Sequence, residues 1–167
     1  DVFNSWAYFQ VEPPAFEYFD VFSEDKPSIR QEQIFKFFEL GSRILVLRPD
    51  FTMPIARLAA TKLKDMTLPL RLSYMGNIYR YTGEQSGKQR EIAQAGIELM
   101  GIEGPEADAE VIAIAIESID RLGLKRFQID IGQVEFYKGF IENCNLDFRQ
   151  SQRLTELIES KDMLALE

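Results

Sequence analysis

The sequence contains no histidine and only one cysteine, Cys144. Without histidine the protein lacks the most common general base, the usual pH-sensitive side chain and the most frequent metal ligand. One thiol cannot form an internal disulfide bond, so nothing indicates an oxidising compartment. A zinc site would need carboxylates, alone or with that thiol. We therefore expect no metal and no cofactor, and we expect Cys144 to be partly buried and without a chemical role.

Long hydrophobic runs and an excess of basic residues are also absent. The longest aliphatic run, residues 111–116, is far too short to cross a membrane, and the first residues show no basic leader followed by an apolar core. The net charge is -8 and the isoelectric point is about 4.7. This balance argues against a nucleic-acid surface, because phosphate binding needs clustered Lys and Arg. We expect a cytoplasmic protein with no membrane association.

The composition fits one folded domain, because 46% of the 167 residues are hydrophobic. The sequence does not begin with methionine and stops inside a helix-like pattern. We therefore expect residues 1–167 to be part of a domain that is shortened at both ends. Residues 127–131 predict a short strand, and helical patterns over 134–143 and 148–160 predict a helical appendage over about residues 133–167.

Hairpin patterns dominate the first half of the chain. Residues 33–40 and 43–48 have strand-like composition, and Gly41 and Ser42 lie between them. A two-residue connection that starts with glycine predicts a type II′ turn. Successive hairpins with helices between them indicate an α+β domain, in which helices pack on one face of an antiparallel sheet.

Two amphipathic helices are predicted in the larger part of the chain. Residues 52–63 have apolar positions at helical spacing, and either Asp50 or Thr52 can cap this helix. Residues 105–122 predict a second helix that stops at Gly123. Its predicted buried stripe consists of Ile112, Ile116, Ile119 and Leu122.

The most informative stretch is residues 71–101, which predicts two long strands joined by a polar loop over residues 81–89. Side chains alternate between the two faces of a strand, so positions of the same parity share a face. One face carries a polar set with two glycines: Gly76, Arg80, Arg90, Gln94, Gly96 and Glu98. The opposite face of the second strand is predicted to be core: Ala93, Ala95, Ile97 and Leu99.

This polar face has two interpretations. If the ribbon closes symmetrically, Gly76 lies opposite Gln94, and Tyr74 lies opposite Gly96. Glycine inside a strand often marks the close approach of a ligand, and a carboxylate such as Glu98 suits an ammonium group. The face then forms the floor of a pocket for a small zwitterion. The alternative is an exposed sheet face with solvated charges, and the pattern alone does not choose between the two.

Three segments resemble a known enzyme family: LRPDFT at 47–52, NIYR at 77–80 and GKQREIAQAGIELMG at 87–101. They are similar to the catalytic core of class II aminoacyl-tRNA synthetases of the histidyl branch. The resemblance implies an antiparallel sheet flanked by helices. It also implies that an amino acid is held by Asp50, Thr52, Gln94 and Glu98. By the same resemblance, Arg80 matches the arginine that contacts the adenylate phosphate.

The chain departs from that family where ATP is bound. Tyr81-Thr82-Gly83-Glu84 replaces the pattern R-x-E-R-P from the arginine onward, and Ile92 replaces a phenylalanine. Base–aromatic stacking is worth ~1–3 kcal/mol per base, so adenine binding should be impaired if that ring is a stacking partner. Asp50 also replaces the usual glutamate, which shortens that side chain.

IDIGQVEFYKGF at 129–140 and ESKDMLALE at 159–167 resemble a second family, the regulatory subunits of ATP phosphoribosyltransferase. This resemblance implies a non-catalytic protein of histidine biosynthesis that does not bind tRNA. It implies a self-dimer involving residues 2–22 and a hetero-oligomer with a short-form catalytic subunit. The regulatory subunit would activate that catalytic subunit, and histidine would inhibit the complex by allosteric feedback. The alternatives are a catalytic fragment of an active histidyl-tRNA synthetase and a stand-alone amino-acid-binding module.

Overall fold

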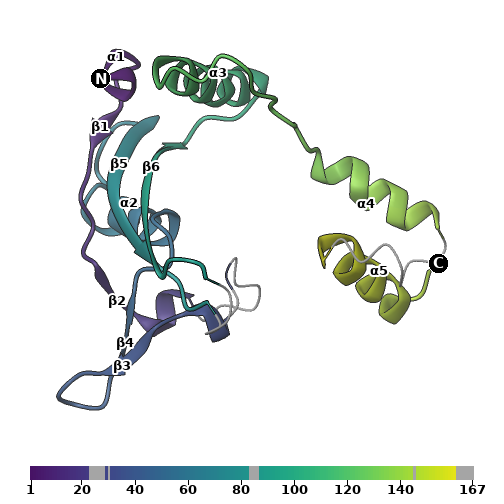
Figure 1. The fold of residues 1–167 in the computed structure, drawn as a ribbon, viewed down its shortest axis with the longest axis horizontal. Coiled ribbons are helices and arrows are strands. Elements are labelled where there is room, and N and C mark those ends of the chain that lie inside the picture. Colours follow the sequence, from purple (N-terminus) through teal and green to yellow (C-terminus); the bar gives the residue numbers. More distant parts are fainter. Residues whose placement is uncertain (23–28, 30, 83–86, 145, 161–167) are drawn as a thin grey trace. The chain divides into compact units, whose positions relative to one another are not determined.

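The computed structural model describes residues 1–22, 29, 31–82, 87–144 and 146–160. The chain divides into two compact units, Asp1–Lys125 and Arg126–Glu167. The smaller unit contains α4 (Val134–Asn143) and α5 (Phe148–Ser160), which confirms both predicted helices (Figure 1). The predicted strand at residues 127–131 is wrong, because this segment has no regular structure. Within the described ranges, no helix is long and apolar enough to span a membrane.

The predicted ribbon forms the main sheet of the larger unit. Strand β5 (Leu70–Tyr79) pairs antiparallel with β6 (Glu91–Met100), and the short strand β1 (Phe9–Gln10) pairs in parallel on the other edge of β5 (Figure 1). The register places Gly76 opposite Gln94 and Tyr74 opposite Gly96. Both predicted pairs are therefore confirmed, and the ribbon closes symmetrically about its loop.

A second, antiparallel sheet has the strand order β2-β4-β3, formed by Phe16–Tyr18, Ile44–Leu47 and Lys36–Phe38. The hairpin is confirmed, but its predicted turn type is wrong. The Ser42 amide donates to the Glu39 carbonyl at 3.2 Å, so Leu40 and Gly41 occupy the centre of the turn. Gly41 has φ +124° and Ser42 has φ +69°, whereas a II′ turn needs a positive φ at its first central residue.

Helix α2 (Thr52–Thr61) packs on the face of the ribbon that carries the even-numbered residues. The buried side chains there are Phe51, Ile55, Leu70, Leu72, Tyr74 and Ile78. The predicted core face is therefore wrong, since Ala93 and Ala95 are exposed and Ile97 and Leu99 are only half-buried. The even residues of β5 are apolar, and they set which face the helix covers. The polar residues of β6 lie on the same face as this core.

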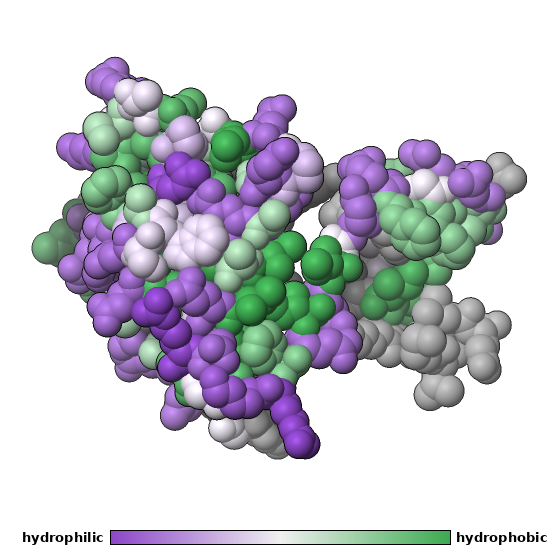
Figure 2. Space-filling model, turned by 90° about the horizontal axis from the view of Figure 1, so that it is seen from above, coloured by the Kyte–Doolittle hydropathy of each residue, from purple (hydrophilic) through white to green (hydrophobic). Residues whose placement is uncertain are grey.

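Helix α3 (Pro105–Arg121) ends before Gly123, as expected. Its predicted stripe is wrong, because Ile116 is 43% exposed and Leu122 is 80% exposed, whereas Ile114 is buried. Figure 2 shows apolar side chains gathered among polar ones on the surface seen from above.

Two acids occupy the inner face of α3 in place of the expected apolar residues. Glu110 accepts hydrogen bonds from Tyr8 Oη at 2.8 Å and from Arg71 Nε at 2.8 Å. Glu117 accepts from Trp6 Nε1 at 2.7 Å. Hydrophobic periodicity does not register carboxylates that are held in partly buried positions by such partners, and this explains the misplaced stripe.

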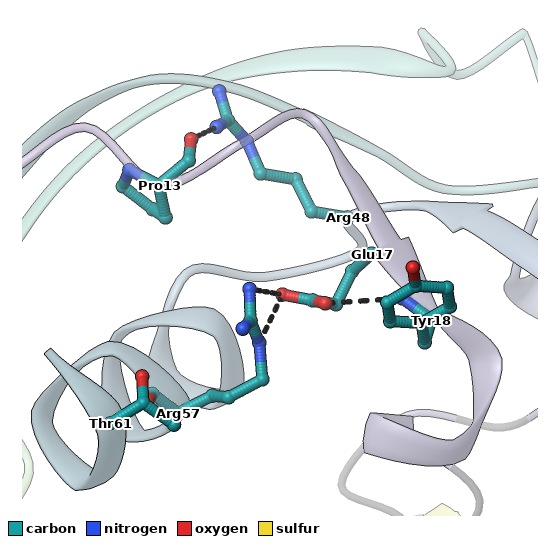
Figure 3. A network of polar contacts seen from close by, with 6 residues as sticks. All are labelled: Pro13, Glu17, Tyr18, Arg48, Arg57 and Thr61. Atoms are coloured by element: carbon teal, nitrogen blue, oxygen red, sulfur yellow. Dashed lines mark hydrogen bonds and ion pairs between the residues drawn. The ribbon is translucent and has the colours of Figure 1, made fainter.

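The second sheet is joined to α2 by a buried carboxylate. Glu17 on β2 has a side chain that is only 2% exposed and forms an ion pair with Arg57 of α2 at 2.9 Å (Figure 3). A second core lies beside this sheet: Phe22, Ile29, Ile34 and Val46. In the smaller unit, Cys144 is exposed, so its predicted partial burial is wrong.

Candidate functional site

The start of α2 and the middle of β6 bring two predicted site residues into contact. Thr52 is the first residue of α2, and its Oγ1 donates to Glu98 Oε1 at 2.8 Å. Asp50 lies just before the helix, and its Oδ1 accepts from the amide of Met53 at 3.2 Å. The N-cap position itself is occupied by Phe51, and neither predicted residue is the N-cap. The Asp50 carboxylate satisfies an amide of the first turn from one position earlier, and Thr52 is left to face the sheet.

A third predicted residue, Gln94, lies beside the same contact. Its Nε2 donates to Tyr74 Oη at 3.4 Å. Its Oε1 is buried and has no hydrogen-bond partner in the part of the chain that the structure describes. A buried acceptor without a donor is costly, about 1–3 kcal/mol. The position therefore suits a ligand that brings an N–H group.

Electrostatics give this site a net negative character. Burial raises the pKa of Glu98, the nearby charge of Asp50 raises it further, and the hydrogen bond from Thr52 opposes both effects. Burial also raises the pKa of Tyr74, and the two carboxylates add to that shift. No ion pair to Asp50 or Glu98 occurs among the described residues. We call Asp50, Thr52, Gln94 and Glu98 the acidic site.

The two glycines of the predicted floor lie under side chains of the protein itself. A Cβ on Gly76 would lie 3.1 Å from Arg48 Nη2 and 3.1 Å from Phe51 Cζ. A Cβ on Gly96 would lie 2.5 Å from Tyr74 Cζ and closer still to its hydroxyl. The glycines thus make room for aromatic rings, and these rings form the wall of the acidic site.

Sequence reasoning missed the residue that anchors this wall, Arg48. Its side chain is buried, its Nε donates to the Asn77 carbonyl at 2.8 Å and its Nη1 donates to the Pro13 carbonyl at 2.6 Å. The guanidinium lies over the Phe51 ring at 4.2 Å, and this ring stacks on Tyr74 with centroids 4.3 Å apart. Burial lowers the pKa of Arg48. Its place in the LRPDFT segment was the only available signal.

The remaining predicted residues lie outside this cluster of contacts. Arg80 Nε donates to the Pro49 carbonyl at 2.9 Å, and Arg90 lies over the Tyr81 ring at 5.1 Å. Ile92, which replaces the phenylalanine of synthetases, is 38% exposed. Gly83 and Glu84, which carry part of the departure from R-x-E-R-P, lie outside the described residues, and so does most of the segment 159–167.

Other features of the larger unit bear on what the acidic site can bind. Within the described ranges, no group of three or more His, Cys, Asp or Glu side chains is arranged to hold a metal ion. A cavity of about 490 Å³ lies on the opposite face of the ribbon, where Ser73, Met75 and Ala95 contribute to its lining. The acidic site is therefore distinct from that cavity.

The chain is similar to known proteins over its whole length. A family model described as histidyl-tRNA synthetase matches residues 1–167. An ATP phosphoribosyltransferase regulatory subunit of Acetivibrio thermocellus is 53% identical over 166 residues, covering 99% of this chain and 40% of that protein. One of Clostridium acetobutylicum is 48% identical over 161 residues, covering 96% of this chain and 40% of that protein.

Solved structures agree with the family match. A Bacillus halodurans protein described as an ATP phosphoribosyltransferase regulatory subunit/histidyl-tRNA synthetase superposes with a TM-score of 0.89 at 37% identity. The match covers 98% of this chain and 42% of that one. The fold is therefore that of class II histidyl-tRNA synthetases, with sheets flanked by helices. The chain spans about 40% of the length of the curated relatives it matches.

Proposed function

This chain belongs to the histidyl-tRNA synthetase family, and from that membership we propose that it is part of a regulatory subunit of ATP phosphoribosyltransferase. The observation that carries the proposal is its identity of 53% and 48% to proteins with that name. The departures from the synthetase pattern around Arg80 and Ile92 support it, because they remove groups that would bind ATP. In this proposal the chain is not an enzyme, acts in the cytoplasm and forms a self-dimer.

The proposed ligand of the acidic site is histidine. The charges of Asp50 and Glu98 act on each other, Gln94 Oε1 is buried without a donor, and neither carboxylate forms an ion pair among the described residues. A protonated amine supplies the missing charge and three N–H donors. Glu98 and Asp50 would attract the ammonium group, and Gln94 Oε1 would accept one of its hydrogen bonds.

The proposed regulation is a change in the complex with the short-form catalytic subunit. Histidine can shift that complex only by binding one arrangement more tightly than another, and such coupling is typically ~1–3 kcal/mol. The catalytic subunit would be active with this protein bound and inhibited when histidine favours the other arrangement.

The experiment that tests this function measures phosphoribosyl-ATP synthesis by a short-form catalytic subunit, with and without the complete protein that carries this chain. We expect stimulation by the protein and loss of that stimulation on adding histidine. No stimulation at any ratio of the two proteins would reject the regulatory function. Stimulation that is insensitive to histidine would reject the feedback role and keep the activating role.

An active histidyl-tRNA synthetase is the second candidate, favoured by the family model that spans the chain. It predicts histidine-dependent exchange of pyrophosphate into ATP by the complete protein. Absence of exchange, together with histidine binding in the same preparation, would exclude it. The third candidate is a stand-alone amino-acid-binding module, and co-purification of the complete protein with the catalytic subunit would reject it.

A further inference from the structure

We propose that Tyr74 is a specificity-determining residue of the acidic site, whose hydroxyl donates a hydrogen bond to an acceptor atom of the bound amino acid. This inference rests on the proposed function, because it assumes that the site binds an amino acid. It adds a residue that the family resemblance did not assign to the site.

The acidic site is rich in acceptors and poor in donors. Asp50, Glu98 and Gln94 Oε1 all accept, and the Thr52 hydroxyl already donates to Glu98. A zwitterion carries acceptor atoms beside its ammonium group, and these atoms need a donor. Tyr74 has one to offer, since its oxygen accepts from Gln94 Nε2 and its proton has no acceptor among the described residues.

The tyrosine is held in place for this role. The residue is 6% exposed, and its ring lies between Phe51 on one side and Gly96 on the other. Phe51 is itself covered by the Arg48 guanidinium, which two backbone carbonyls fix. A buried ring with neighbours on both faces has little freedom to rotate away, so its hydroxyl position is preorganised.

The Tyr74 hydroxyl also stays protonated, as a hydrogen-bond donor must. Burial raises its pKa, and the charges of Glu98 and Asp50 act in the same direction. At neutral pH the hydroxyl therefore keeps its proton and is a donor. The acceptor on the ligand is either a carboxylate oxygen or an unprotonated ring nitrogen, and both occur in histidine.

The test uses the complete protein and titration calorimetry with histidine and with histamine, which lacks the carboxylate. The variant Tyr74→Phe removes only the hydroxyl, and we expect histidine to bind about three- to tenfold more weakly, as for one lost hydrogen bond. If histamine affinity is unchanged, the acceptor is the carboxylate. If histamine weakens equally, the acceptor is the ring nitrogen. Either result supports the proposal.

The matched control is Tyr79→Phe, on the same strand but on the opposite face of the ribbon, where the hydroxyl donates to Glu91 at 3.3 Å. It should bind both ligands like wild type. Wild-type affinity of Tyr74→Phe for histidine would overturn the role of Tyr74 while leaving the proposed function intact. Absence of binding by the wild-type protein would overturn both.

A second variant, Gly96→Ala, tests whether the position of the Tyr74 hydroxyl matters for histidine binding. Gly96→Ala would place a Cβ only 2.5 Å from Tyr74 Cζ, so the ring must move and the hydroxyl leaves its position. Adding Tyr74→Phe to this variant should then weaken histidine binding no further. Gly139→Ala is the control, since a Cβ there meets nothing within 4 Å. Additive losses in the double variant would contradict the proposal, and the Tyr74→Phe result stands alone if Gly96→Ala does not fold.

Discussion

Glu98→Gln is the sharpest test of the acidic site, because it should weaken ligand binding without lowering the stability of the free protein. The substitution removes a charge and keeps the side-chain length. Thr52 can still donate to the amide oxygen, as it donates to the carboxylate now. Loss of one hydrogen bond to a charged group costs ~1.5–3 kcal/mol, so histidine should bind about 10- to 150-fold more weakly.

The stability of the unliganded protein should not fall. Burial raises the pKa of Glu98 above its ordinary value, so ionised Glu98 is less favourable in the folded state than in the unfolded state. The stabilising contribution of protonated Glu98 is therefore fully present below the pKa of Glu98 in the unfolded state, and it is lost as the pH rises through the pKa in the folded state. Glutamine does not ionise, so Glu98→Gln should unfold at the same or a higher urea concentration than wild type at pH 7.

Calorimetry and urea unfolding of the complete protein measure the two effects. The control is Glu91→Gln, on the same strand but on the opposite face, where the carboxylate is exposed and accepts from Asn77 Nδ2 at 2.6 Å. It should leave histidine affinity unchanged. If Glu98→Gln binds histidine like wild type, the polar face is merely solvated. If it lowers the stability of the free protein, Glu98 has a structural role instead.

Three further predictions concern Asp50, Phe51 and Glu110. Asp50→Asn should weaken histidine binding and move the pKa of Glu98 toward its ordinary value, measured by NMR titration, because a nearby negative charge is removed. Phe51→Ala should cost about 3–5 kcal/mol in urea unfolding, because the ring is buried, whereas exposed Phe38→Ala should change stability by about 0.5 kcal/mol or less. A hydrogen bond from Arg71 lowers the pKa of Glu110, so ionised Glu110 stabilises the folded protein above its unfolded pKa, and this stabilisation is lost as the pH falls through its folded pKa. Glu110→Gln should remove that pH-dependent stabilisation. Acid unfolding measures that last effect, and a parallel acid limb in wild type and variant would contradict it.

The symmetric register of the ribbon and the ends of α3 were predictable because they depend on local features of the sequence. A polar loop between two strands of equal length fixes which residues are opposite each other, and proline and glycine mark where a helix begins and ends. The candidate residues Asp50, Thr52, Gln94 and Glu98 came from the family resemblance. The resemblance did not give the contacts between elements, such as the hydrogen bond from Thr52 to Glu98.

Burial and the partners of polar groups were not predictable in this way. The sequence suggested core on the face with Ala93 and Ala95, yet α2 packs on the other face, where the apolar residues of β5 lie. The face that α2 covers depends on its contacts with the apolar residues of β5, and the alternation within β6 alone does not contain that information.

The sequence by itself determined the two long strands of the ribbon, the positions of the main helices and the family to which the chain belongs. Only the tertiary structure decided what the glycines are for and which hydroxyl meets which carboxylate. Gly96 makes room for the ring of Tyr74, 22 positions earlier in the chain, and Thr52 meets Glu98, 46 positions later. Such contacts form when packing brings separate elements within a few ångströms, and local propensity does not specify them.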